Sequence, residues 1–222
     1  MDSDYVCRLR NQSMALIQSL DQHPLLGRVI HGDASRDEYV EFLWSTYHYI
    51  RWSGPLLAAT ADGLKRRGSD DFLFDLLVTK TREEAPHDGW VLRDLRNCGE
   101  NVELGKALPA PIAVDAYVTW SRAMAADGSP AFLGAAYTLE IMSMHRAKRA
   151  ADNLRARATI PGIEKALLFL DGHADADVDH ISSLESVLAR IEDRDDQSAI
   201  HLSAMVMGAL YPRFFQVPSH RA

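Results

Sequence analysis

Two histidines and an aspartate in the last third of the chain have the spacing of ligands on a helix. His173, Asp177 and His180 stand at positions i, i+4 and i+7, so on one helix their side chains would share a face. Apolar residues fall on the same face, namely Phe169, Leu170, Ile181, Leu184 and Leu188. Polar groups within an apolar stripe need partners, and a bound metal ion suits all three side chains. The alternative is a solvated acidic helix face.

A second candidate pair, Glu84 and His87, lies on a predicted helix over 70–97. Its face is otherwise apolar, with Leu73, Leu77, Val91 and Leu95. Glu83 could replace Glu84 as the inward carboxylate, because Pro86 must disturb the helix and shift its register. We prefer Glu84. Taken alone, a Glu-x-x-His pair is more often a solvated surface pair than a metal site.

Glu140 is a third candidate, a lone carboxylate on an apolar stripe formed by Leu133, Tyr137, Ile141 and Met144. Taken alone, such a Glu is more often a satisfied buried carboxylate or a helix-pairing residue than a metal ligand. The complete candidate set is Glu84, His87, Glu140, His173, Asp177 and His180. Three imidazoles and three carboxylates suit two iron or manganese ions bridged by carboxylates, whereas a structural zinc site usually has four ligands that include thiolates. Helical bundles build such sites from Glu-x-x-His pairs and further carboxylates.

The elements that must position these residues are helices. The hydrophobic period is close to 3.6 residues almost throughout, and no alternating segment bounded by turn signals indicates a strand. Breaks rich in Gly and Pro delimit seven predicted helices, over 4–22, 36–66, 70–97, 111–126, 130–157, 162–191 and 197–216. The connections are short and no repeat is found. Residues 1–222 are therefore predicted to form a single all-α bundle.

Composition excludes several classes of function. The chain has 222 residues, of which 47% are hydrophobic and 25% charged, as in an ordinary globular protein. The net charge of -7 argues against binding to nucleic acid or to an anionic membrane surface. Two cysteines, Cys7 and Cys98, suit a reducing compartment, and no apolar run approaches the roughly 18 residues of a membrane span. We expect a cytoplasmic protein.

A substrate pocket is predicted beside the helix over 36–66. Trp44, Tyr47 and Arg51 lie at helical spacing on one side of it, offering aromatic walls and one cation. A guanidinium there would favour a substrate that carries a carboxylate. The alternative is an aromatic stripe of the core. The apolar segment 202–215 is predicted either to pack inside the bundle or to form a homodimer surface.

The segment 167–180, together with residues 83–90 and Glu140, resembles the heme-oxygenase-like diiron oxidases and oxygenases. That family is similar to heme oxygenase, TenA and PqqC in its seven-helix fold. The resemblance implies two non-heme irons bound by a first Glu, a His, a second Glu and a final His-x-x-x-Asp-x-x-His. The matching residues here are Glu84, His87, Glu140, His173, Asp177 and His180. In some members the first Glu lies seven residues before the His, where this chain has Lys80.

The resemblance also implies an activity. We expect an O2-dependent oxygenase that uses two Fe2+ ions and electrons from an external reductant or reductase. The expected substrate is a small amine or amino-acid-like metabolite, and N-oxygenation to a hydroxylamine or nitro product is preferred. Oxidative C–C cleavage or decarboxylation at the same site is one alternative. A metal-free enzyme like TenA and PqqC is another, as is a helical protein that only binds a partner, but a metal-free site leaves the His173 motif without a purpose.

Overall fold

The computed structural model describes residues 4–69, 71–174 and 178–216, and these residues form helices joined by short connections. The helices are α1 (Asp4–Leu20), α2 (Pro24–His31), α3 (Arg36–Ile50), α4 (Ser53–Arg67), α5 (Asp71–Glu84), α6 (His87–Asn97), α7 (Val102–Gly105), α8 (Ile112–Ala126), α9 (Phe132–Arg157), the 3-10 turn η1 (Ile163–Lys165), α10 (Leu168–Ala174), α11 (Val178–Leu188) and α12 (Arg194–Phe214). Within these described ranges there is no strand, so the all-α prediction is confirmed.

The predicted number of seven helices is wrong, because two of the long predicted helices are broken where proline interferes. The helix expected over 36–66 divides into α3 and α4 at residues 51–52, and Pro55 falls in the first turn of α4, where its missing N–H costs nothing. The helix expected over 70–97 divides into α5 and α6 around Pro86. Each break turns the chain and resets which side chains face inward.

The segment expected as one helix over 162–191 is also divided. It begins with the 3-10 turn Ile163–Lys165, continues as α10 and resumes as α11. Two short helices, α2 and α7, were not expected. His23 caps α2, because its ring nitrogen accepts hydrogen bonds from the backbone N–H groups of Leu25 and Leu26.

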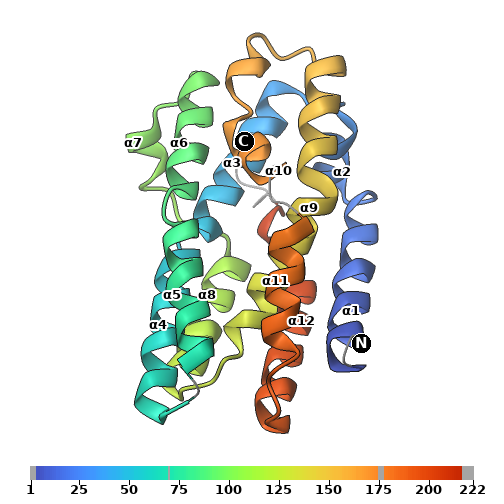
Figure 1. Cartoon of the computed structure of the whole chain (residues 1–222). Helices are drawn as coiled ribbons and strands as arrows, with labels where there is room; N and C mark the ends of the chain where they lie inside the picture. The colour runs from blue at the N-terminus through green and yellow to red at the C-terminus, as the bar shows by residue number, and fades with distance from the viewer. Residues whose placement is uncertain (1–3, 70, 175–177, 217–222) are drawn as a thin grey trace.

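The long helix α9 is the centre of the packing. It contacts α1, α2, α10 and α12, while α4 packs against α5 and α8 (Figure 1). Gly134 permits the approach of α9 to α12, since a Cβ atom there would lie 1.9 Å from the carbonyl oxygen of Ile200. Buried apolar side chains from these helices form a connected core cluster. The elements that carry the candidate residues are thereby held around α9.

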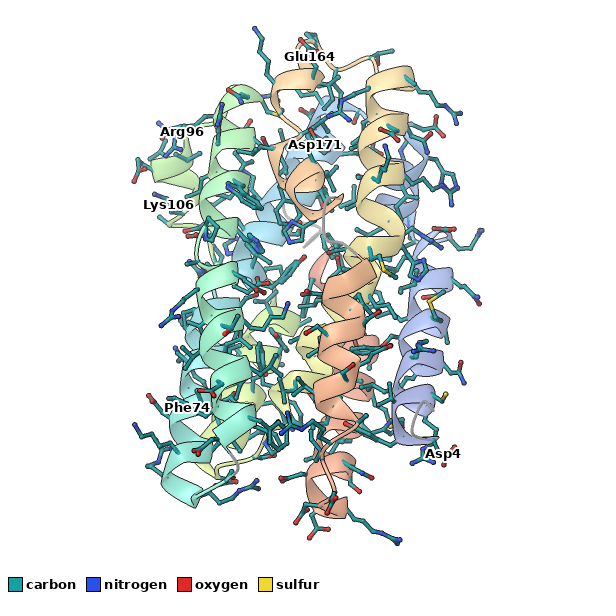
Figure 2. The ribbon with its side chains drawn as sticks, viewed as in Figure 1. Asp4, Phe74, Arg96, Lys106, Glu164 and Asp171 are labelled. Atoms are coloured by element: carbon teal, nitrogen blue, oxygen red, sulfur yellow. The ribbon has the colours of Figure 1, made fainter. Side chains whose placement is uncertain are left out.

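Charged side chains such as Arg96 and Glu164 project from the outside of the bundle (Figure 2). Of the helices in the described part of the chain, none combines the length and the apolar content that crossing a bilayer requires.

Candidate functional site

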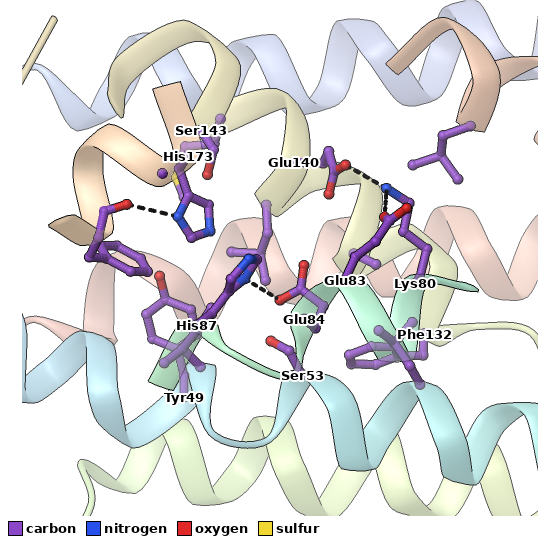
Figure 3. A pocket seen from close by; sticks show the side chains of 18 of the residues that line it. Tyr49, Ser53, Lys80, Glu83, Glu84, His87, Phe132, Glu140, Ser143 and His173 are labelled. Atoms are coloured by element: carbon purple, nitrogen blue, oxygen red, sulfur yellow. Dashed lines mark hydrogen bonds and ion pairs between the residues drawn. The ribbon is translucent and has the colours of Figure 1, made fainter. Parts of the chain in front are cut away.

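A cavity of about 290 Å³ lies among α4, α5, α6, α9 and α10. Much of its wall is apolar and includes Ile50, Leu57, Leu133, Ala136 and Leu139. Six lysine, glutamate and histidine side chains also line it, namely Lys80, Glu83, Glu84, His87, Glu140 and His173 (Figure 3). A largely apolar cavity with a few convergent polar groups is the usual form of a small-molecule site.

Glu84 and His87 face each other across the break at Pro86. Glu84 is the last residue of α5 and His87 is the first residue of α6. Nδ1 of His87 lies 2.9 Å from Oε2 of Glu84. Burial alone would raise the pKa of Glu84, but the hydrogen bond from His87 and the nearby charges hold this pKa below its ordinary value. The ionised carboxylate can only accept, so Nδ1 of His87 donates this hydrogen bond, which leaves Nε2 without a partner among the described residues.

His173 approaches the same place from α10. Its Nδ1 lies 2.9 Å from the carbonyl oxygen of Phe169, which can only accept a hydrogen bond, so Nδ1 is the protonated nitrogen here too. The His173 ring centroid lies 4.4 Å from that of Phe169 and 4.4 Å from that of His87. Burial, with a smaller electrostatic contribution from the neighbouring His87, lowers the pKa of His173 to about 4. The ring is therefore neutral at physiological pH, the form that binds metals.

Asp94 fixes the start of α10. Its two carboxylate oxygens accept hydrogen bonds from the backbone N–H groups of Leu168 and Phe169, at 3.0 and 2.8 Å. These N–H groups have no partner inside the helix, so Asp94 acts as a cap supplied by α6. Burial raises the pKa of Asp94 to about 6, against the effect of the two hydrogen bonds. The α6 helix thus positions His173 through Asp94 and carries His87 itself.

Trp90 packs against both imidazoles. Its ring centroid lies 4.6 Å from that of His87 and 6.1 Å from that of His173. Gly172 makes room for this indole, because a Cβ atom at Gly172 would lie 2.5 Å from the ring. We call Glu84, His87 and His173 the imidazole cluster.

Lys80, Glu83 and Glu140 form a second group, which we call the ammonium cluster. Nζ of Lys80 lies 2.7 Å from Oε1 of Glu140 and 2.8 Å from Oε2 of Glu83 (Figure 3). The side chains of Lys80 and Glu140 are 11% and 16% exposed, whereas that of Glu83 is 42% exposed. Burial would lower the pKa of Lys80, but Glu140 and Glu83 together hold it above its ordinary value. Lys80 is therefore a charged ammonium in a mostly buried position.

Four of the six predicted ligands line this cavity, namely Glu84, His87, Glu140 and His173. Asp177 and the side chain of His180 lie outside the described residues. The choice between Glu83 and Glu84 also gains a geometric basis: Glu84 faces His87, while Glu83 pairs with Lys80 and is the more exposed. As ligands, all six residues stay a prediction.

The three residues predicted to bind substrate do not line the cavity in the described part of the chain. Trp44 packs closely on Gly105 of α7, Tyr47 contacts Trp44, and the guanidinium of Arg51 stacks over Tyr47. The wall near this helix is formed instead by Tyr49, Ile50 and Ser53. Two residues along a helix turn the side chain by about 200°, so 47 and 49 face opposite ways.

Lys80 and Trp90 line the cavity but were not predicted to do so, although helical spacing points to both. Lys80 lies four residues before Glu84 and seven before His87, and Trp90 lies three after His87. These separations place side chains on one helix face. The break at Pro86 made the continuity of that face uncertain from sequence alone.

The described donors fit an iron site in chemical type. Both imidazoles use Nδ1 in a hydrogen bond, and among the described residues neither Nε2 has a partner, which is the arrangement common to metal-binding histidines. Carboxylates supply the other donors and no thiol lines the cavity, which favours iron or manganese over structural zinc. Within the described ranges, no three His, Cys, Asp or Glu side chains are grouped closely enough to hold a metal ion. In this structure the carboxylate of Glu140 accepts a hydrogen bond from Lys80, and the carboxylate of Glu84 accepts one from His87.

A family model described as iron-containing redox enzyme matches residues 40–211 of this chain. The match includes every predicted ligand and both clusters. No curated protein sequence matches the chain.

Solved structures share the fold. A domain of unknown function with a heme oxygenase-like fold from Shewanella denitrificans has a TM-score of 0.80 at 18% identity, covering 94% of this chain and 89% of that one. A TenA homolog from Pseudomonas syringae pv. tomato has a TM-score of 0.72 at 15% identity, covering 96% and 91%. A TenA homologue from P. horikoshii has a TM-score of 0.74 at 14% identity, covering 95% and 96%. At these identities the likeness shows a heme-oxygenase-like fold.

Proposed function

The chain belongs to the iron-containing redox enzyme family, and from that premise we propose that it is a non-heme diiron oxygenase acting on a small amine or amino-acid-like metabolite. N-oxygenation of the substrate is the preferred outcome. The observation that carries the proposal is the convergence of Glu84, His87, Glu140 and His173 on one mostly buried cavity, from four different helices.

Different residues of the cavity would have different roles in the reaction. Glu84, His87, Glu140 and His173 would hold iron, together with Asp177 and His180. When bound, ferrous iron would supply electrons for the activation of dioxygen, and an external donor would restore them. His173 stays neutral, so its Nε2 lone pair is available.

The remaining wall would exclude water from the reaction. Leu57, Leu133 and Leu139 contribute apolar surface around the polar groups. The cavity of about 290 Å³ suits a small metabolite and leaves no room for a macromolecule.

Anaerobic reconstitution with Fe2+ followed by iron analysis and O2 addition tests the proposal. We expect about two irons per chain, as in other bundle-core carboxylate sites, and consumption of O2 that depends on substrate. Mass spectrometry of reactions with amines, amino acids and fatty acids would identify the substrate and distinguish a product with added oxygen from one that has lost carbon. Less than about one iron per chain with no O2 consumption would contradict the diiron assignment.

A metal-free, TenA-like enzyme is the second candidate. The observation that favours it is the ion pair between Lys80 and Glu140, in which a cation of the chain itself balances a carboxylate of the cavity. Such a protein would turn over its substrate with no dependence on iron or O2. Oxidative C–C cleavage by the iron site is a third outcome, recognised by the loss of one carbon fragment from the product.

A further inference from the structure

We propose that Lys80 is an internal counter-cation of Glu140 that metal binding displaces, and that the released ammonium then binds an anionic group of the substrate. The inference rests on the proposed function for the presence of metal. It goes further by naming the residue that selects the charge of the substrate.

Lys80 forms ion pairs with two carboxylates at the wall of the cavity. Its ammonium is mostly buried and has two carboxylate partners, of which Glu140 is the more buried. A buried charge without a partner is strongly unfavourable, so the pair with Glu140 contributes much of what keeps Lys80 inside the bundle. Glu83, at 42% exposure, is a partner partly screened by water.

Lys80 and a metal ion compete for the same carboxylate. Nζ of Lys80 donates to Oε1 of Glu140, one of the predicted ligands. A divalent cation on Glu140 repels the ammonium and takes over its acceptor. Of its two carboxylate partners, Lys80 then keeps the exposed Glu83 (both pairs are drawn in Figure 3), and the ammonium remains available at the cavity wall.

The charge balance of the loaded cavity favours an anion. The described lining carries one positive charge, on Lys80, and three negative charges, on Glu83, Glu84 and Glu140. Two divalent ions would bring four positive charges, which leaves a positive excess even when Asp177 is counted. An anionic group beside Lys80 restores both the local pairing and the overall balance.

Among the cations near the cavity, Lys80 is better placed than Arg51 for this role. The guanidinium of Arg51 stacks over the rings of Tyr47 and Trp52, at 5.4 and 5.6 Å, and does not line the cavity. The same cavity is lined by the apolar side chains of Ala136 and Leu139 on α9. A carboxylate on a compact apolar body fits this surrounding, whereas a simple amine would meet a like charge.

Binding of Mn2+ and of hexanoate tests the proposal without any turnover. Mn2+ affinity is measured from the electron paramagnetic resonance signal of the free ion, and hexanoate affinity by calorimetry on metal-free and Mn2+-loaded protein. We expect hexanoate to bind the loaded wild type at least about tenfold more tightly than the metal-free protein. Hexanamide, which has the same shape without the charge, should show no such preference.

Substitution of Lys80 separates its two roles. Lys80→Met should bind Mn2+ about fivefold more tightly, because the competing ammonium is gone, and should bind hexanoate about tenfold more weakly when loaded. Lys80→Arg should keep both wild-type behaviours. Lys148→Met is the matched control, because Lys148 pairs with Asp152 on the exposed face of α9.

A measurement on the wild type alone guards against a variant that does not fold. By reciprocity, saturating hexanoate should tighten Mn2+ binding by the same factor by which Mn2+ tightens hexanoate binding. Metal binding with an unchanged hexanoate affinity in Lys80→Met overturns this inference alone, since the metal itself would then hold the carboxylate. Failure of the wild type to bind Mn2+ or Fe2+ overturns this inference and the proposed function together.

Discussion

The two clusters of the cavity differ in how firmly their polar atoms are held. In the imidazole cluster, His173 is hydrogen-bonded to the backbone of its own helix and His87 is hydrogen-bonded to Glu84. The two imidazole rings are in tilted contact, with their centroids 4.4 Å apart. In the ammonium cluster, Lys80 is held by ion pairs to two flexible carboxylate side chains. One cluster is therefore pre-organised and the other can exchange partners.

The difference assigns separate tasks to neighbouring groups. Ring nitrogens whose orientation is already fixed lose little entropy when they bind a cofactor. A lysine on a flexible stem can leave one carboxylate for another at small cost. A site that must hold metal firmly and accept substrate transiently benefits from having both.

Loss of a fixed imidazole is expected to have the largest effect. His173→Ala removes the ligand proposed on α10, so we expect O2 consumption to fall by at least about 100-fold while the melting temperature changes little. His145→Ala, on the exposed face of α9, is the control and should retain wild-type consumption. Unchanged turnover in His173→Ala would refute the ligand assignment.

Removal of the cap that positions His173 tests pre-organisation more indirectly. Asp94→Ala leaves the N–H groups of Leu168 and Phe169 without their acceptor, so we expect a loss of about 2 kcal/mol in the free energy of unfolding, measured with urea. Iron affinity should fall as well, because the first turn of α10 is held less rigidly and His173 on this helix is then less precisely positioned. Asp152→Ala, which removes an exposed ion-paired carboxylate, should change neither quantity appreciably.

A buried imidazole outside the cavity provides a contrast in pH dependence. Among the described residues Nδ1 of His48 has no hydrogen-bond partner, and burial with the nearby charge of Arg51 lowers the pKa of His48 from 6.5 to about 4, against the opposing charge of Asp115. The unfolded chain therefore takes up a proton between these values while the folded chain does not. Stability is fully present above pH 6.5 and is lost as the pH falls toward 4.

We expect the free energy of unfolding to drop by about 1.5 kcal/mol between pH 6.5 and about pH 5 on account of His48. His48→Leu should flatten this part of the profile, measured by urea unfolding at each pH. An identical slope in wild type and variant would show that other groups determine it.

The smallest effect is expected for a substitution of Arg51, the residue that caps the C-terminal end of α3. Arg51→Met should change the affinity of Mn2+-loaded protein for hexanoate by less than about twofold, because Arg51 does not line the cavity. A loss as large as that of Lys80→Met would instead support the substrate role that the sequence pattern predicted for Arg51.

The sequence was most informative where a pattern depends on helical period. It predicted an all-α chain, the disturbance at Pro86 and a common location for Glu84, His87, Glu140 and His173, because apolar spacing identifies the inward face of a helix. It was wrong about helix number and placed the pocket wall on Trp44 and Tyr47. Composition alone does not distinguish an aromatic stripe of the core from one that lines a cavity.

Lys80 shows a further limit of reasoning from sequence. The family resemblance allows the first Glu at position 80, so from sequence alone Lys80 suggests only that a ligand is missing there. Its ion pair with Glu140 joins residues 60 positions apart in the chain, and such pairing depends on how α5 and α9 meet. No local pattern records that contact.

The position of Trp90 gives the site an optical signal of its own. An indole in ring contact with both imidazoles should lose fluorescence when a paramagnetic ion binds between them, so occupancy of the cavity could be followed without a label. Trp90→Phe would supply the blank against the emission of Trp44, Trp52 and Trp120. Gly172, which has no Cβ atom, lets the Trp90 indole lie close to the imidazoles, and this closeness makes the Trp90 fluorescence sensitive to occupancy of the site.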